Sequence, residues 1–398
     1  MNLDDLILES KITDLKNKIQ AWGVKRKLWT DTGFKTHYEH YEDEPSEYGA
    51  CVLILWSEGG MNGMLAGYSH SDFLDEFDAF MDGFEFYYER LESCVYGFYA
   101  KEEDLNEAYL KYFEWQWVTE LIKPDYTSLY QEVFEYFNKN PKRLYLLSSR
   151  KFEILISEVF KNQGFRSELG KGQNDGGVDI RLYKKDEIDE IVTLVQVKKY
   201  KPGLPIDLQA VSSLTAIVNQ ENANRGLFVT TSRYLPVAQR FATRESTRLT
   251  LANAEDVSRW CANTSNLINR DKSVLLEDVF LLALLKSKIN NGLVGKIVVA
   301  NNNYGMITND FCLVVKETSN VILLMRISSI PVTEGNKPAE TRGYEIPILN
   351  EQIVKHKTKE DVFRAQKKID LRGEPYYWGH KNLYTLWDGT PQYYDLND

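Results

Sequence analysis

Cysteine is scarce in this chain of 398 residues. The four cysteines, Cys51, Cys94, Cys261 and Cys312, lie far apart, and no two have the two- to four-residue spacing of a zinc knuckle. Four distant thiols do not make a disulfide framework either, so we expect a protein of the reducing cytosol.

Long hydrophobic runs are also missing. The most apolar stretch, residues 274–285, is too short to span a bilayer and contains Glu277 and Asp278. The first residues, Met-Asn-Leu-Asp-Asp, lack the basic and apolar parts of a signal peptide. The sequence therefore predicts neither membrane insertion nor secretion.

Histidine is absent between residues 141 and 262, and the whole chain has five. This excludes a histidine-dependent nuclease or a Ser-His-Asp hydrolase built within that segment. His37 and His40, near Glu39 and Glu42, suggest a metal site at first. On an extended strand, however, they would point to opposite faces, which favours a solvated acidic surface.

Positive charge is in deficit overall, with 48 Lys and Arg against 58 Asp and Glu and a net charge of −10. An acidic total counts against a nucleic-acid partner, because binding phosphates requires positive charge. The deficit is local, however: residues 1–140 have 12 basic and 28 acidic side chains (−16), residues 141–262 sum to +5 and residues 263–398 to +1. The central segment is therefore compatible with DNA.

Three segments follow from this charge pattern, and the length suits two or three domains. We expect an acidic, aromatic-rich α+β domain at 1–140, an α/β domain at 141–262, and a helix plus a β-rich, small barrel-like domain at 263–398. The proposed boundaries are the proline-containing stretch 138–143 and the polar stretch 262–266. In the flanking segments the patterns predict helices within 71–90, 102–137 and 273–289, and strands at 51–56, 293–300, 311–316 and 321–327.

The central segment has the clearest pattern. Ser148 and Ser149 can cap a helix whose apolar residues recur at three- and four-residue steps up to Gly164. Strands are predicted at 165–169, 178–183, 191–198, 226–230 and 248–251, and further helices at 207–219 and 236–244. The order is αβββαβ with additions.

Period-two geometry places polar groups on one side of the hairpin formed by 178–183 and 191–198. Asp179 points away from the face of Ile180, and Gln196 and Lys198 share a face. Phosphodiester hydrolysis would explain an acid and an amine in such strands. A carboxylate and a backbone carbonyl, such as that of Val197, hold Mg²⁺, and the lysine removes a proton or stabilises charge. The alternative is an ion pair between Asp179 and Lys198 on a solvent-facing sheet.

Four ordered motifs extend this interpretation: Phe152-Glu153, Asp175-Gly176-Gly177-Val178-Asp179, the run from Gln196 to Gly203, and the run from Gly226 to Ser232. With them, residues 143–260 resemble the Mrr-like restriction endonuclease domain, a branch of the PD-(D/E)xK nuclease superfamily. The resemblance implies that Asp179 binds metal, that Lys198 is the active-site lysine and that Glu153 is the helix glutamate. Gln196 stands where many superfamily members have Glu or Asp, which leaves one fewer negative ligand and makes Glu153 more important.

Two local alternatives remain. Glu158 is a second glutamate on the same helix, and we expect it on the outer flank, with Glu153 on the inward side. The Asp175-Gly176-Gly177 run is predicted to be a tight turn that also borders the site, since glycines let the backbone approach a phosphate.

Basic residues near the expected strand ends favour a DNA partner. They are Lys171, Lys198, Lys199, Lys201, Arg225, Arg233, Arg240 and Arg244. Phosphate contacts are expected from Lys171, Lys199, Lys201 and Arg233. An ordinary solvated surface would have a similar charge.

The resemblance implies a Mg²⁺-dependent DNA endonuclease, with Mn²⁺ as a substitute, of restriction type II or IV. It would act on double-stranded DNA in restriction or anti-phage defence in a prokaryotic cytoplasm, as a homodimer or with a partner protein. The acidic segment 1–140 would regulate the enzyme, by covering the basic cleft, or bind a partner. The alternative is a catalytically silent DNA-binding or regulatory protein.

Overall fold

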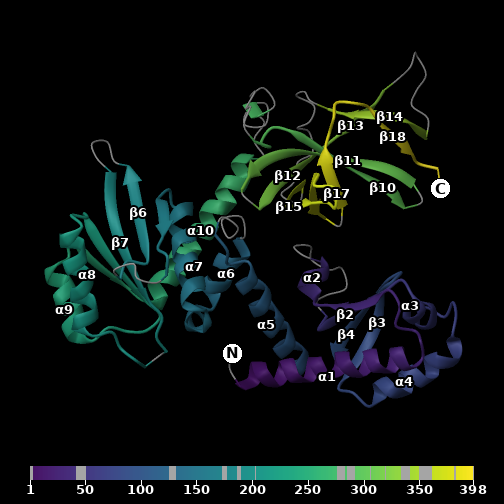
Figure 1. Cartoon of the computed structure of the whole chain (residues 1–398), viewed down its shortest axis with the longest axis horizontal. Helices are drawn as coiled ribbons and strands as arrows, with labels where there is room; N and C mark the ends of the chain where they lie inside the picture. The colour runs from purple at the N-terminus through teal and green to yellow at the C-terminus, as the bar shows by residue number, and fades with distance from the viewer. Residues whose placement is uncertain are drawn as a thin grey trace. The chain divides into compact units, whose positions relative to one another are not determined.

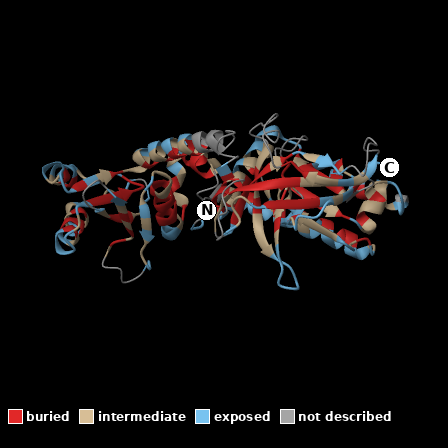
Figure 2. Cartoon of the chain, turned by 90° about the horizontal axis from the view of Figure 1, so that it is seen from above, coloured by how far each residue is buried: buried red, intermediate tan, exposed pale blue. Residues whose placement is uncertain are grey.

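A computed structural model of the chain describes residues 3–41, 51–124, 131–172, 177–185, 190–201, 203–275, 283–284, 292–304, 306–318, 320–332, 341–348, 361–380 and 382–397. The chain forms two units, residues 1–120 and 121–398 (Figure 1). Each unit has its own buried residues, most of them on strands and on the inner faces of helices (Figure 2). Among the described helices, none has the length and apolar character needed to cross a bilayer.

The first unit combines helices with an antiparallel sheet. Its elements are α1 (Leu3–Lys25), β1 (Thr32–Lys35), α2 (His37–Tyr41), β2 (Leu53–Ser57), α3 (Gly60–Leu65), α4 (Leu74–Asp82), β3 (Phe86–Glu92), β4 (Val95–Ala100) and α5 (Glu103–Glu120). The strands pair in the order β1-β2-β4-β3. One face of the sheet packs with α1, α4 and α5 through residues such as Ile19, Leu53, Phe77, Phe98 and Phe113.

Two expectations for this unit are wrong in part. Residues 71–90 are mostly helical, since a 3₁₀ helix (Ser71–Phe73) and α4 cover residues 71–82, but the aromatic run from Phe86 enters β3. His37 and His40 lie on the short helix α2 rather than on a strand, and His37 is buried, with Nδ1 3.6 Å from Cys51 Sγ. Burial lowers the pKa of His37 to about 4. Glu42 lies outside the described residues.

The central sheet has five strands in the order β5-β6-β7-β8-β9. The elements of this region are α6 (Gln131–Lys139), a 3₁₀ helix (Pro141–Leu146), α7 (Ser149–Asn162), β5 (Arg166–Leu169), β6 (Ile180–Lys185), β7 (Glu190–Lys198), α8 (Leu208–Gln220), β8 (Arg225–Thr230), α9 (Pro236–Arg244), β9 (Leu249–Ala252) and α10 (Ala254–Leu275). Helices and strands follow the predicted αβββαβ order, with α9 and β9 as the additions. Helices α8 and α9 cover one face of the sheet, and α7 packs on the other (Figure 1).

Side-chain caps set the start of two of these helices. Ser148 Oγ accepts a hydrogen bond from Lys151 N at 3.1 Å, and Asp207 Oδ1 accepts one from Ala210 N at 2.9 Å. Each satisfies a backbone N–H that has no partner within its own helix. Ser148, Asp207 and their helices lie as the sequence predicts.

Strand direction in this sheet decides which ends meet. Strand β6 runs antiparallel to both of its neighbours, β5 and β7, whereas β8 and β9 run parallel to β7. The carboxyl ends of β5, β7, β8 and β9 therefore share one edge with the amino end of β6. We call this the carboxyl edge of the sheet.

The C-terminal strands form a six-stranded barrel, which confirms the small β-rich barrel expected there. The ring is β10-β17-β16-β15-β12-β11, and the pairing of β10 with β11 closes it. Strands β18, β14 and β13 extend the sheet from β11. The bounds are β10 (Ile297–Tyr304), β11 (Met306–Glu317), β12 (Val321–Ile327), β13 (Ser329–Pro331), β14 (Arg342–Pro347), β15 (Val362–Ile369), β16 (Pro375–Gly379), β17 (Asn382–Leu386) and β18 (Gln392–Asp395).

Helix α10 occupies the polar stretch that we expected to separate the second and third segments. Residues 262–266 are helical and lie in the middle of this element, with Thr264 fully buried. Of the helix predicted at 273–289, residues 276–282 and 285–289 lie outside the described residues.

Candidate active site

The candidate residues gather at the carboxyl edge of the central sheet. Asp179 directly precedes β6, and Gln196, Val197 and Lys198 are the last residues of β7. Lys171 follows β5, Lys199 and Lys201 follow β7, and Arg233 follows β8. Because β6 runs opposite to β5, β7 and β8, residues far apart in the sequence reach the same edge.

Asp179 is bonded to the neighbouring strand through both backbone and side chain. Its Oδ2 accepts a hydrogen bond from Val197 N at 2.6 Å, and its own N–H donates to Val195 O at 2.9 Å. The β6–β7 register begins with Ile180 opposite Val195, and Asp179 lies directly before it. The structure therefore places the Asp179 carboxylate against the backbone of Val197, between Gln196 and Lys198 in the sequence.

Lys198 projects from the same face as Gln196, two residues farther along β7. Leu194, on that face as well, packs with Phe228 and α8 in a buried apolar cluster. Gln196 is buried, whereas Lys198 is half-buried. The amide and the amine thus lie where the apolar cover of this face ends, and the Asp179 carboxylate bonds the backbone of Val197 between them.

Glu153 reaches this region from α7. Its carboxylate Oε2 accepts a hydrogen bond from Arg150 Nη1 at 3.0 Å, and the same nitrogen donates to Gly170 O at 2.8 Å. Gly170 N–H in turn donates to Asp179 O at 2.7 Å. Glu153 is therefore connected to Asp179 through Arg150 and Gly170. Within the described ranges, no three Asp, Glu, His or Cys side chains form a group that could hold a metal ion.

Glu158 is not on the outer flank of α7, so that prediction is wrong. Its side chain is fully buried and accepts a hydrogen bond from Lys161 Nζ at 2.8 Å. Helix α7 is covered by the sheet and also by α10, where the rings of Phe160 and Trp260 lie 5.2 Å apart. A helix with two covered faces leaves no exposed flank at Glu158.

The Gln196 amide has one unsatisfied atom. Its Oε1 is buried and has no hydrogen-bond partner in the described part of the chain. A buried carbonyl oxygen without a partner is costly, and native proteins usually supply one. This oxygen belongs to the residue before Val197, whose N–H binds the Asp179 carboxylate, and it is a hard oxygen ligand of the kind that Mg²⁺ prefers.

Gly177 packs closely against this amide. Its φ is +87°, in the region that favours glycine, and a Cβ there would lie 3.2 Å from Gln196 Nε2 and 3.5 Å from Ile217 Cδ1. Of the predicted turn, Asp175 and Gly176 lie outside the described residues. The conformation of Gly177 nevertheless supports a turn next to the candidate site.

We expect Gly177→Ala to impair cleavage by displacing the Gln196 amide. A left-handed φ costs a non-glycine residue about 1–2 kcal/mol, and the new methyl group would crowd the amide. The measurement compares cleavage rate and melting temperature with those of Gly203→Ala. Gly203 has a φ of +99°, but a Cβ there would meet none of the described atoms within 4 Å. Equal cleavage by the two variants would contradict the close packing inferred at Gly177.

Basic side chains divide between the two edges of the sheet. Lys171, Lys201 and Arg233 are exposed at the carboxyl edge, and Lys199 there is half-buried. Arg225 instead begins β8, and Arg244 ends α9, so both lie toward the opposite edge. The expectation that Arg225 and Arg244 cluster with Arg233 is therefore wrong. The edge at which each residue lies depends on the direction of the strands.

One group near the site was not singled out by sequence reasoning. Arg150 bridges Glu153 and Gly170, and its only sequence signal is a three-residue step from Glu153 on a helix. The hydroxyl residues Thr230, Thr231 and Ser232 end the fourth sequence motif, and because they are buried they need hydrogen-bond partners.

Comparison with known families agrees with this geometry. A family model described as a restriction endonuclease, of the Mrr catalytic type, matches residues 144–261. The chain contains an Mrr-like restriction endonuclease domain. The match confirms the resemblance seen in the four sequence motifs and covers less than a third of the chain.

Individual relatives of the Mrr-like domain cover similar shares. The uncharacterized protein y4cE of Sinorhizobium fredii is 27% identical over 124 residues, which are 31% of this chain and 32% of that protein. This chain thus matches about a third of that relative's length. The MspJI restriction endonuclease in complex with a 27-mer oligonucleotide is 20% identical, with a TM-score of 0.27 over 36% of this chain and 34% of that one. The DNA modification-dependent restriction endonuclease AspBHI is 18% identical, with a TM-score of 0.27 over 37% and 41%.

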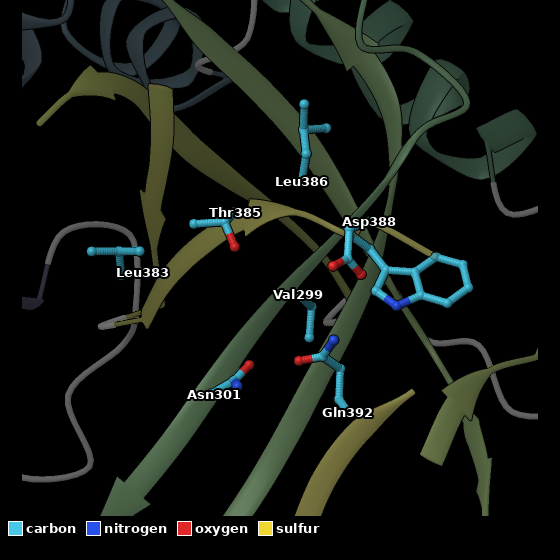
Figure 3. Close-up of a pocket in the computed structure, with 8 residues that line it drawn as sticks. Val299, Asn301, Leu383, Thr385, Leu386, Asp388 and Gln392 are labelled. Atoms are coloured by element: carbon cyan, nitrogen blue, oxygen red, sulfur yellow. The ribbon is translucent and has the colours of Figure 1, made fainter. Parts of the chain in front are cut away.

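A pocket of about 360 Å³ lies on the barrel, not in the Mrr-like domain. It is lined by Val299, Asn301, Leu383, Thr385, Leu386, Trp387, Asp388 and Gln392, from β10, β17, β18 and the residues between the last two (Figure 3). Its lining includes neither a basic side chain nor a candidate catalytic residue. The candidate active site is therefore defined by its side chains and not by this pocket.

Proposed function

We propose that this chain is a Mg²⁺-dependent endonuclease that hydrolyses phosphodiester bonds of double-stranded DNA. The observation that carries the proposal is the bond between the Asp179 carboxylate and Val197 N–H, which brings Asp179 to the Gln196–Lys198 end of β7, at the carboxyl edge of a domain that matches the restriction endonuclease family. We assign it to restriction or anti-phage defence in the cytoplasm, as an enzyme of type II or IV.

The residues at this edge suit a divalent cation. Asp179 would hold it together with the Gln196 side-chain oxygen and the backbone carbonyl of Val197, and Glu153 is the second acidic candidate. A bound Mg²⁺, or Mn²⁺ in its place, lowers the pKa of water and offsets negative charge on the reacting phosphate. The buried Oε1 of Gln196, which has no partner among the described residues, supports this fit.

The chain's own groups then have separate tasks. Asp179 keeps its position through the hydrogen bond from Val197 N–H, so its carboxylate does not need to reorganise on binding. Lys198 is the group that removes a proton from the attacking water or stabilises charge on the phosphate. Gln196 orients water or phosphate. Arg150 holds the Glu153 carboxylate against the Gly170 loop.

Cleavage of plasmid DNA by the full-length protein tests the proposal. We expect nicking or linearisation that requires Mg²⁺ or Mn²⁺, stops with EDTA, and differs between matched methylated and unmethylated duplexes if a modification is recognised. DNA binding without cleavage under any of these metals would favour the catalytically silent alternative. If the protein neither bound nor cleaved DNA, both the nuclease proposal and the catalytically silent DNA-binding alternative would be contradicted.

The exposed basic residues of the carboxyl edge are proposed to contact DNA phosphates. Each lost phosphate contact reduces the slope of log K against log salt by about 0.9. The triple change Lys171→Gln, Lys201→Gln and Arg233→Gln is therefore expected to lower that slope by about 2.7, with weaker binding to all sequences. The control is Arg225→Gln with Arg244→Gln, toward the opposite edge. A slope that falls as much in this control would place the DNA elsewhere.

The flanking segments are proposed to supply specificity and control. Residues 1–140, with a charge of −16, form the regulatory or partner-binding part, and residues 263–398 form the recognition part. Cutting two strands needs two sites, which suggests a homodimer. Light scattering of the protein with and without DNA measures this directly.

A further inference from the structure

Three consecutive hydroxyl residues lie where β8 ends. Thr230 is the last residue of the strand, and Thr231 and Ser232 follow it. All three are buried, although each carries a polar side chain. Buried hydroxyls are costly without partners, so their hydrogen bonds show what holds them there.

The partners lie on one segment, the residues at and after the end of β7. Thr230 Oγ1 donates to Lys198 O at 2.8 Å, and Ser232 Oγ donates to Leu204 O at 2.6 Å. Thr231 Oγ1 donates to Tyr200 O at 2.7 Å and accepts from Tyr200 N at 3.0 Å. We call Thr230, Thr231 and Ser232 the hydroxyl clamp.

The clamp continues the pairing of two parallel strands beyond their ends. The β7–β8 register stops at Lys198 and Thr230. Beyond these two residues, the side-chain hydroxyls take the place of backbone groups and hydrogen-bond the residues that follow β7. Backbone bonding resumes where Ile206 N–H donates to Arg233 O at 2.8 Å. The segment between these points is thereby fixed at its start, its middle and its end.

This segment contains three basic residues of the candidate site. Lys198 is its first residue, and Lys199 and Lys201 flank Tyr200. The backbone around Lys198 is bonded on both sides: Val197 N–H donates to the Asp179 carboxylate, and Lys198 O accepts from Thr230. The hydroxyl of Thr230 therefore fixes the backbone of Lys198 on the side away from Asp179.

We propose that the hydroxyl clamp is a set of positioning residues with divided tasks. Thr230 sets the position of Lys198 against Asp179, and Thr231 sets the positions of Lys199 and Lys201 for DNA phosphates. This inference rests on the proposed nuclease function. Reacting groups displaced by about 1 Å can lose a hundredfold in rate, whereas displaced phosphate contacts weaken binding.

The divided tasks predict different kinetic effects in the full-length protein. Thr230→Val is expected to lower kcat by about tenfold to a hundredfold while DNA affinity stays within about threefold. Thr231→Val is expected to weaken DNA binding by about tenfold with little change in kcat. Thr230→Ser and Thr231→Ser keep the hydroxyl and should retain wild-type values. Hydrogen exchange of the peptide that contains Tyr200 should accelerate in Thr231→Val, because its N–H loses its acceptor.

Thr215→Val is the matched control. Thr215 is also buried, but its hydroxyl bonds Val211 O within its own helix α8. If Thr230→Val resembles this control in kcat, or if Thr230→Val and Thr231→Val alter the same parameter equally, the clamp proposal is overturned while the nuclease proposal stands. A wild-type protein that cleaves no DNA with any metal overturns the nuclease function, and the catalytic purpose of the clamp with it.

Discussion

Replacing Asp179 by asparagine is expected to reduce DNA cleavage by at least about a thousandfold, or about 4 kcal/mol in activation free energy. The asparagine keeps a side-chain oxygen that can accept the hydrogen bond from Val197 N–H. The fold should therefore survive while the proposed negative metal ligand is lost. Cleavage rates over a range of Mg²⁺ concentrations, together with melting temperature and DNA affinity, separate loss of metal binding from loss of folding.

Glu190→Gln is the matched control for Asp179→Asn. Glu190 undergoes the same change from carboxylate to amide, but it lies at the start of β7, eight residues from Lys198, and is exposed in an ion pair with Arg166. We expect the Glu190→Gln variant to cleave DNA at the wild-type rate. If Asp179→Asn kept more than a tenth of the wild-type rate at saturating Mg²⁺, Asp179 would not be the metal ligand.

Removing the amine of Lys198 is expected to have the second largest effect. General acid–base catalysis contributes about 10²–10⁴-fold, and Lys198→Met should lose a rate factor in that range. DNA affinity should change little, because Lys171, Lys201 and Arg233 remain exposed at the same edge. Single-turnover cleavage rates as a function of pH give the comparison.

Lys198→Arg separates the two roles that remain open for Lys198. Arginine keeps the positive charge but does not deprotonate in proteins, so it can stabilise charge but cannot accept a proton. Substantial rescue would favour charge stabilisation, whereas a rate as low as that of Lys198→Met would favour the general base. The control is Lys184→Met, at the far end of the same hairpin, where Lys184 pairs with Ile191. A Lys198→Met variant as active as this control would contradict either role.

Much of the central domain was predictable because its signals are local. The alternation in β7 involves residues two apart, and it places Gln196 and Lys198 on one face before any tertiary contact is known. The caps Ser148 and Asp207 likewise act within three residues. These features survive in the structure because tertiary packing did not oppose them.

Other expectations failed where packing between distant elements decides the outcome. Glu158 is fully buried on a helix that packs against both the sheet and α10, which lies about a hundred residues later. The barrel strand β15 is rich in polar residues, so its sequence does not stand out as a strand. In the structure, its apolar residues Phe363 and Ala365 face the interior of the closed barrel. Local hydrophobicity does not predict such strands, since one face of each remains partly exposed.

The sequence by itself determined the charge division of the chain, the order of helices and strands in the central domain, and the polar residues that share a face of the hairpin. Each depends on composition or on neighbours within a few residues. Only the tertiary structure decided that Arg233 lies at the site edge while Arg225 and Arg244 do not, and that the hydroxyl clamp bonds the segment after Lys198. The physical reason is that strand direction and pairing arise from contacts between residues far apart in the sequence, which no local pattern specifies.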